Sequence, residues 1–146
     1  MDVRKIVNKT TNDIGEFGTL LFEIEVNAHI MHLQTKGRGS FAVHSALNSL
    51  YQDIVGWRDN FLESYQGKYG IVTGYKPIQI MTVSPKEYVA MKVTEVEMYR
   101  SKFNDGYLQQ IIDSIIELLY STKYKLDNLE WVSAIYNLNE IKIQLK

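Results

Sequence analysis

The spacing of apolar residues constrains this chain most strongly, because they recur in steps of three and four. Between residues 13 and 35 the apolar positions are Ile14, Phe17, Leu21, Ile24, Ala28 and Met31. Such steps place the side chains on one face of an α-helix, and that face is expected to be buried. Asp13 and Glu16 have the spacing of a capping box. The pattern therefore predicts a helix over residues 13–35.

A second apolar stripe predicts a helix over residues 41–65. Its members are Phe41, Leu47, Leu50, Ile54, Trp57, Phe61 and Tyr65. The sequence SPKE at residues 84–87 then has Ser at a cap, Pro at the first helical position and Glu three after the cap. This is a strong start signal, and it predicts a third helix over residues 85–102.

The last forty residues predict two more helices. One covers residues 107–123, with an apolar stripe at Leu108, Ile111, Ile112, Ile115, Leu118 and Leu119. The other covers residues 128–143 and would begin at a capping box of Asp127 and Glu130. The stretch before residue 85 is rich in glycine and is expected to be a long connection, extended in part at IQIMTV.

These elements predict one all-α domain over residues 1–146. Its bundle would consist of the helices at 13–35, 41–65, 107–123 and 128–143. The helix at 85–102 would be an additional one, in the long connection between the second and third bundle helices. A four-helix bundle with one long crossover is the connectivity of the ferritin-like class.

Composition excludes several functions and locations. The 146 residues contain no cysteine, so disulfides and thiolate metal sites are excluded. The formal net charge is −1, which provides no strong field for nucleic acid or anionic lipid. No apolar run resembles a signal peptide or reaches the roughly 20 residues of a membrane span. The expected location is cytoplasmic.

Four side chains have the chemistry of a metal site. His32 and His44 flank the sequence KGRG, which is expected to form a turn between two helices. Asp59 and Glu63 are four residues apart and share one helix face. Imidazole nitrogens with carboxylate oxygens suit iron, manganese or zinc.

If these four residues belong to one site, their spacing requires a second copy of the chain. His44 and Asp59 are 15 residues apart on one predicted helix, so they are separated by about 22 Å along its axis. They cannot bind the same ion within one chain. An antiparallel second copy would bring its Asp59 and Glu63 to the first copy's histidines. A two-fold dimer would form two such sites.

The pattern resembles the miniferritins, the Dps family of DNA-binding proteins from starved cells. The matching residues are His32, Gly37, Phe41, His44, Asp59 and Glu63, with Leu50-Tyr51 and Trp131 at further family positions. The resemblance implies a ferroxidase centre shared between two subunits, in which the four ligands bind two Fe(II) ions. It also implies a shell of twelve chains that stores oxidised iron and protects against iron and peroxide.

The chain departs from the family pattern at three positions. Asn48 stands where the family has an acid, and its amide oxygen would be a weaker ligand for the second iron. Leu33 and Ser64 replace a Trp and an Arg that are frequent in the family. His29 is interpreted as a half-buried structural residue with metal ligation as the alternative, and Trp57 and Trp131 are interpreted as packing residues.

Two other functions remain as alternatives. One is a non-catalytic ferritin-like structural or partner-binding protein, in which the site is vestigial or binds a single Zn(II). The other is a di-iron enzyme within one chain, which would usually need Glu-x-x-His motifs that this sequence lacks. DNA binding has weak support, because the basic residues of the two ends are sparse: Arg4, Lys5, Lys9, Lys142 and Lys146.

Overall fold

The computed structural model describes the backbone of residues 3–144 and the side chains of residues 13–129. This backbone is all-helical and contains no strand. Its elements in chain order are α1 (Val3–Gln34), α2 (Ser40–Tyr69), α3 (Pro85–Tyr99), a short 3-10 turn η1 (Arg100–Lys102) and α4 (Gly106–Gln144).

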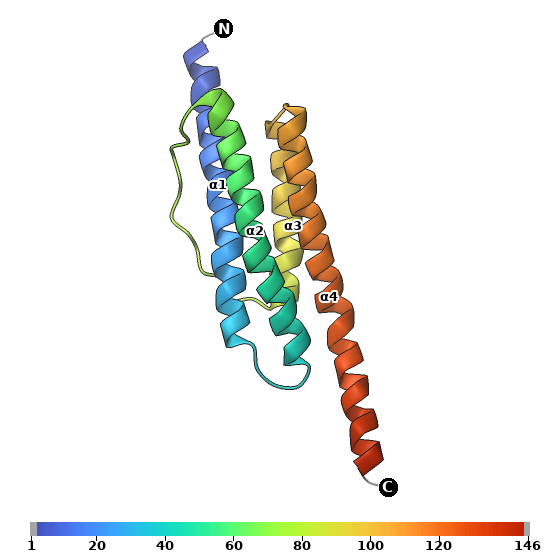
Figure 1. The fold of residues 1–146 in the computed structure, drawn as a ribbon. Coiled ribbons are helices and arrows are strands. Elements are labelled where there is room, and N and C mark those ends of the chain that lie inside the picture. Colours follow the sequence, from blue (N-terminus) through green and yellow to red (C-terminus); the bar gives the residue numbers. More distant parts are fainter. Residues whose placement is uncertain (1–2, 145–146) are drawn as a thin grey trace.

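The four helices form two antiparallel pairs (Figure 1). A short turn joins α1 to α2, and η1 with three further residues joins α3 to α4. Residues 70–84, which we call the strap, run back along α1 from the end of α2 to the start of α3 (Figure 1). Because of this long connection, α2 and α3 run in the same direction. The far half of α4 projects beyond the α1–α2 turn (Figure 1).

The apolar stripe of α1 forms one side of the core, as predicted. All six of its residues between Ile14 and Met31 are buried. At one end of the bundle the ring of Phe17 packs against Phe61 of α2, with centroids 4.8 Å apart, and against Phe103, at 5.5 Å. The stripe on α4 is buried too, except that Leu118 is half-buried.

The stripe on α2 was predicted wrongly at two positions. Phe41 is 81% exposed and Trp57 is 36% exposed. The next residue, Arg58, takes the inward position and is only 7% exposed. Its guanidinium lies 4.0 Å from the ring centroid of Phe22 and pairs with Glu25, both on α1. A buried arginine needs such partners, and these come from another helix.

Two predicted helix starts are also wrong. Helix α1 begins at Val3, and Asp13 lies inside it with a carboxylate oxygen 3.8 Å from Lys102 Nζ. Helix α4 is continuous through Asp127, which pairs with Lys123 one turn earlier at 2.5 Å. Both aspartates therefore lie inside helices and form ion pairs instead of capping them. The pair of Asp127 is four residues apart, a spacing that stabilises a continuous helix.

The bundle consequently has a different composition from the predicted one. The segments 107–123 and 128–143 form a single helix of 39 residues. The helix predicted as an addition, α3, is the third helix of the bundle. Its start was predicted correctly, since Ser84 and Glu87 form the capping box.

Side chains of α1 at four-residue intervals attach the strap. Thr19 Oγ1 accepts from Lys76 N at 2.8 Å, and Glu23 Oε1 accepts from Gln79 N at 3.0 Å. Asn27 Oδ1 accepts from Met81 N at 2.7 Å, and its Nδ2 donates to Gln79 O at 2.9 Å. The strap therefore obtains from helix side chains the hydrogen bonds that a neighbouring strand would provide.

Two glycines of α1 let the strap approach closely. A Cβ atom on Gly15 would lie 2.6 Å from the carbonyl oxygens of Thr73 and Gly74. On Gly18 it would lie 2.8 Å from the ring of Tyr75. Any larger residue at Gly15 would therefore displace the strap backbone.

Some predictions concern side chains outside the described range. They are the packing role of Trp131 and the basic residues of the two ends, Arg4, Lys5, Lys9, Lys142 and Lys146.

Within the described part of the chain, no helix is long and apolar enough to span a membrane.

Candidate metal centre

The turn between α1 and α2 depends on two glycines in left-handed conformations. Gly37 has φ +96° and Gly39 has φ +73°, values that other residues rarely adopt. The turn is closed by a hydrogen bond from Ser40 N to Gly37 O at 3.3 Å. It reverses the chain within a few residues and brings His32, in the last turn of α1, next to His44, near the start of α2.

The two histidines bind each other's backbone reciprocally. Nδ1 of His32 lies 3.0 Å from the carbonyl oxygen of His44, and Nδ1 of His44 lies 3.1 Å from the carbonyl oxygen of His32. The rings stack with centroids 3.6 Å apart and planes inclined by 28°. His32 is 8% exposed, whereas His44 is exposed. The pair therefore lies at the surface, with one buried ring and one open ring.

These hydrogen bonds determine which ring nitrogen is available to a metal. A carbonyl oxygen only accepts, so each Nδ1 must carry the proton that it donates. The neutral form of each ring then has its lone pair on Nε2. A metal-ligating histidine typically has this arrangement, in which the other ring nitrogen donates to a carbonyl and fixes the ring's orientation. In the neutral rings, both Nε2 atoms therefore have a lone pair that could bind a metal ion.

The third histidine extends this aromatic cluster. The ring of His29 stacks on Tyr51 with centroids 4.0 Å apart and planes inclined by 9°. Tyr51 also contacts His32 edge-to-face at 5.2 Å, and the rings of His29 and His32 are 6.0 Å apart. His29 is exposed and not half-buried as predicted. The ring of His32 therefore contacts three other rings, those of His29 on α1 and of His44 and Tyr51 on α2.

Asn48 is already engaged in hydrogen bonds. Its Oδ1 accepts from the hydroxyl of Tyr51 at 2.9 Å and, more weakly, from Nε2 of Gln52 at 3.4 Å. An amide oxygen has two lone pairs, and these bonds use both. Asn48 would have to release one of them to bind a metal. In this structure it orients Tyr51, which in turn packs on His29 and His32.

The two predicted carboxylates lie on the same helix far from the histidines. Asp59 and Glu63 are both exposed and one turn apart on α2. Oδ1 of Asp59 accepts from Nε of the buried Arg58 at 3.0 Å. This bond uses one carboxylate oxygen and leaves Oδ2 for another cation.

The structure therefore brings together two of the four predicted ligands within one chain. His44 and Asp59 both lie on the continuous helix α2, so about 22 Å separates them along its axis. Among the described residues no group of three or more His, Asp or Glu side chains has the geometry to hold a metal ion.

Sequence reasoning missed the role of Arg58 beside this site. Its signal was present, because position 58 follows Ile54 by four and precedes Phe61 by three on the apolar stripe. An arginine at an inward position indicates a buried ion pair. Its partner Glu25 comes from α1, and no local spacing points to that residue.

Together, these observations define an all-helical bundle protein with a reciprocally bonded pair of histidines at one end. Comparison with protein families shows that the chain belongs to DUF5856, a family of unknown function, whose profile matches residues 32–126. The matched segment begins at His32 and includes His44, Asp59, Glu63 and the strap. No curated protein and no solved structure matches the chain.

Proposed function

We propose that this protein is a miniferritin-like iron protein that oxidises Fe(II) and stores the ferric product in a shell built from two-fold dimers. Its sites would lie between two copies, each with His32 and His44 of one chain and Asp59 and Glu63 of the other. The observation that supports it best is the reciprocal bonding of His32 and His44, which leaves both Nε2 atoms as ligands.

The topology is consistent with this class of protein. Two antiparallel helix pairs joined by a long crossover are the connectivity of ferritin-like bundles. In this chain the strap replaces a helix in that crossover. Any shell contacts made through the crossover would therefore use an extended segment.

The exposed face of α2 has features that suit a second copy. Gly56 lies inside the helix, where glycine costs about 1 kcal/mol relative to alanine, and a Cβ there would meet nothing within 4 Å. In an antiparallel pair that places His44 opposite Asp59, Gly56 would lie opposite residue 47 or 48 of the partner. A glycine there lets two helices approach closely. The exposed ring of Phe41 would be covered at the same interface.

The chemistry at such a site is a two-electron oxidation. Two Fe(II) ions are the substrates, and each gives one electron to hydrogen peroxide. The O–O bond breaks, and two protons complete two molecules of water. Imidazole favours Fe(II), while the carboxylates suit both oxidation states, so the ferric product can leave the site.

The first test is iron oxidation by the full chain. The protein is loaded anaerobically with two Fe(II) per chain, peroxide is added, and ferric absorbance is followed beside protein-free buffer. We expect rapid oxidation, a soluble ferric product and a native mass near twelve chains. Oxidation no faster than in buffer, with precipitated iron, would contradict the proposal.

Two variants test whether the site is shared. His32→Asn keeps an N–H donor near the position of Nδ1 but removes Nε2, and Asp59→Asn removes the charge. Each variant should lose most activity alone. In a co-refolded equal mixture half of the dimers are mixed, and each of these has one intact site. About one quarter of wild-type activity should therefore return.

A matched control is Asp53→Asn, an exposed acid on the same helix that the proposal does not use. It should retain full activity. If the mixture of His32→Asn and Asp59→Asn is no more active than either variant alone, while each remains folded and oligomeric, the shared site is wrong.

The ion pair between Arg58 and Asp59 favours a second candidate function, a non-catalytic helical protein with a single-metal site. A protein of this kind would bind one Zn(II) through His32 and His44. It would be smaller than a shell, and Asp59→Asn would leave its zinc affinity unchanged. Under the leading proposal the same variant weakens zinc binding.

A further inference from the structure

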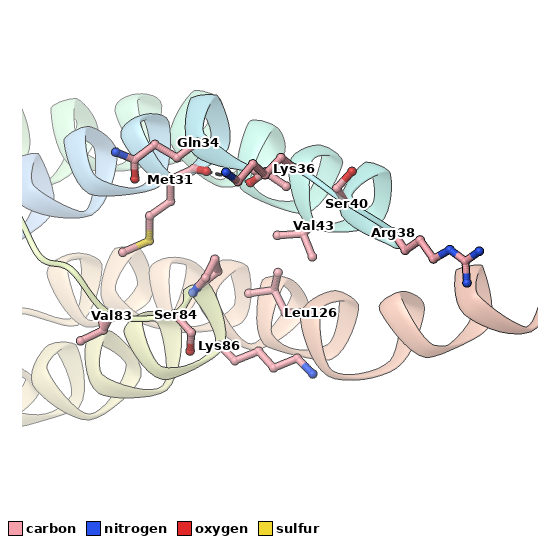
Figure 2. A pocket seen from close by; sticks show the side chains of 12 residues that line it. Met31, Gln34, Lys36, Arg38, Ser40, Val43, Val83, Ser84, Lys86 and Leu126 are labelled. Carbon is pink, nitrogen blue, oxygen red and sulfur yellow. Dashed lines mark hydrogen bonds between the residues drawn. The ribbon is translucent and has the colours of Figure 1, made fainter. Parts of the chain in front are cut away.

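A pocket lies at the same end of the bundle as the histidines, between the α1–α2 turn, the start of α3 and α4 (Figure 2). Its volume is about 460 Å³, within the usual range for small-molecule sites. We propose that this pocket binds a small organic phosphate, with the phosphate at the cationic rim beside the α1–α2 turn and an apolar body on the pocket floor. This inference does not depend on the proposed iron chemistry.

The floor of the pocket is apolar. Met31 and Leu126 are buried, and Val43 and Val83 are half-buried. Figure 2 shows Val43 of α2 and Leu126 of α4 directed toward each other across the pocket. A ligand with an aromatic or aliphatic part would remove these surfaces from water, which provides affinity that a bare ion cannot gain.

The rim of the pocket is cationic. Lys36 and Arg38 come from the turn and Lys86 from α3, and no described residue that lines the pocket is acidic. Neither Lys36 nor Arg38 forms an ion pair with a described residue, although the protein as a whole has a net charge of −1. In Figure 2, Arg38 and Lys86 extend in the same direction on the two sides of the pocket, and Lys36 extends in the opposite direction.

A second pocket of about 340 Å³ shows that this polarity is a local property. It lies between α1, α3 and the strap, and it is lined by Glu16, Glu23 and Glu95 with Lys76 as its one described cation. The chain thus has an acidic pocket on its side and a basic pocket at its end. An anionic ligand would be directed to the basic one.

The side chains around the rim favour phosphate over carboxylate. Arg38 offers a planar fork of donors that matches phosphate oxygens, and Lys36 adds a point charge. Ser40 adds a hydroxyl at the beginning of α2. The hydroxyl of Ser84 is excluded from this role, because it is engaged with Glu87 in the capping box of α3.

Calorimetry with naphthyl phosphate, a probe with an apolar ring system and a terminal phosphate, tests the proposal on the full chain. We expect a submillimolar Kd that weakens as salt is raised. Naphthol lacks the anion and inorganic phosphate lacks the apolar body, so each should bind at least tenfold more weakly. The Lys36→Gln/Arg38→Gln double variant should reduce the affinity about tenfold or more.

The matched control is Lys76→Gln, which removes one exposed lysine from the strap and should leave the affinity unchanged. Equal binding by wild type and the Lys36→Gln/Arg38→Gln double variant would overturn the proposal. So would inorganic phosphate that binds as tightly as naphthyl phosphate. Tighter binding of decanoate would overturn the assignment to phosphate and indicate a fatty carboxylate.

Discussion

Replacement of Asn27 by alanine should weaken the attachment of the strap to α1. Asn27 is 1% exposed, and its amide binds both Gln79 O and Met81 N. Alanine would leave these two strap groups without partners. A buried group that loses its partner costs about 1–3 kcal/mol. Gln79 is exposed, so water can reach its carbonyl, but Met81 is half-buried. Most of the cost therefore comes from the amide of Met81, and the expected loss is about 1–3 kcal/mol.

Urea unfolding of the Asn27→Ala variant measures this loss. Thermal unfolding measures it too: for a chain of this size, 1 kcal/mol shifts the Tm by about 2–4 °C, so a fall of roughly 2–12 °C is expected. Hydrogen exchange adds a local readout, because the amide of Met81 should lose its protection while amides in the middle of α4 keep theirs.

The matched control for Asn27 is Asn128→Ala on α4. Asn128 is exposed and its side chain donates to Tyr124 O of its own helix at 2.9 Å. This substitution should change stability by no more than about 0.5 kcal/mol. If Asn27→Ala costs no more than the control, the hydrogen bonds from α1 do not stabilise the strap and the reasoning is wrong.

Three further predictions concern stability. Gly15→Ala should destabilise the fold by about 1–2 kcal/mol, since its Cβ would meet strap backbone at 2.6 Å. Gly56→Ala should stabilise the isolated chain by about 0.5–1 kcal/mol, because its Cβ would meet nothing within 4 Å. Thermal unfolding measures both changes. The hydrogen bond from Lys68 lowers the pKa of Asp105, so this carboxylate stabilises the fold at neutral pH and loses its effect as pH falls through that pKa. The stability gap between wild type and Asp105→Asn should therefore shrink below pH 4 in urea titrations. Burial raises the pKa of Tyr88, so this tyrosine should stay protonated in alkaline spectrophotometric titration until the chain unfolds.

Each of these predictions has a clear opposite result. A Gly15→Ala protein as stable as Gly56→Ala would mean that the strap does not rest on the helix backbone. A constant gap for Asp105→Asn across pH 2–7 would mean that its carboxylate makes no favourable contact. For Tyr88 the opposite result comes from alkaline titrations of the folded proteins, in which wild type would differ from Tyr88→Phe by one additional tyrosine that titrates with an ordinary pKa. That result would contradict the burial of the Tyr88 ring.

The periodicity of α1 predicted its core residues because its inward face packs evenly on the other helices. The same rule failed on α2 at Trp57 and Arg58, which are neighbours about 100° apart on the helix. Their burial was decided by Phe22 and Glu25 of α1, which stabilise a guanidinium at the inward position. A pattern read along one helix does not contain that information.

The capping-box rule worked for Ser84 and failed for Asp13 and Asp127. An acid three residues after a polar residue is compatible both with a helix start and with a helix interior. Proline at residue 85 breaks the ambiguity for Ser84, because the preceding residue is disfavoured in a helical conformation. No such residue accompanies the two aspartates. Both lie inside helices, where Asp13 pairs with Lys102 of η1 and Asp127 pairs with Lys123 of its own helix.

The candidate site was predictable in part. The spacing of His32, Gly37, Gly39 and His44 already indicated a turn with two neighbouring imidazoles. The reciprocal bonds that select Nε2 depend on the three-dimensional course of the turn, so sequence could not predict them. The contribution of Asp59 and Glu63 stays a prediction, because a second chain is needed to bring them to the histidines.

The strap also has a consequence for the order of folding. Its hydrogen bonds to α1 join residues 52 to 57 positions apart in the chain. The contacts within each helix pair close much shorter loops, and short loops close at a lower entropic cost. We therefore expect the α1–α2 and α3–α4 hairpins to form first. The strap can dock only when α1 is helical, since Thr19, Glu23 and Asn27 share one face only then.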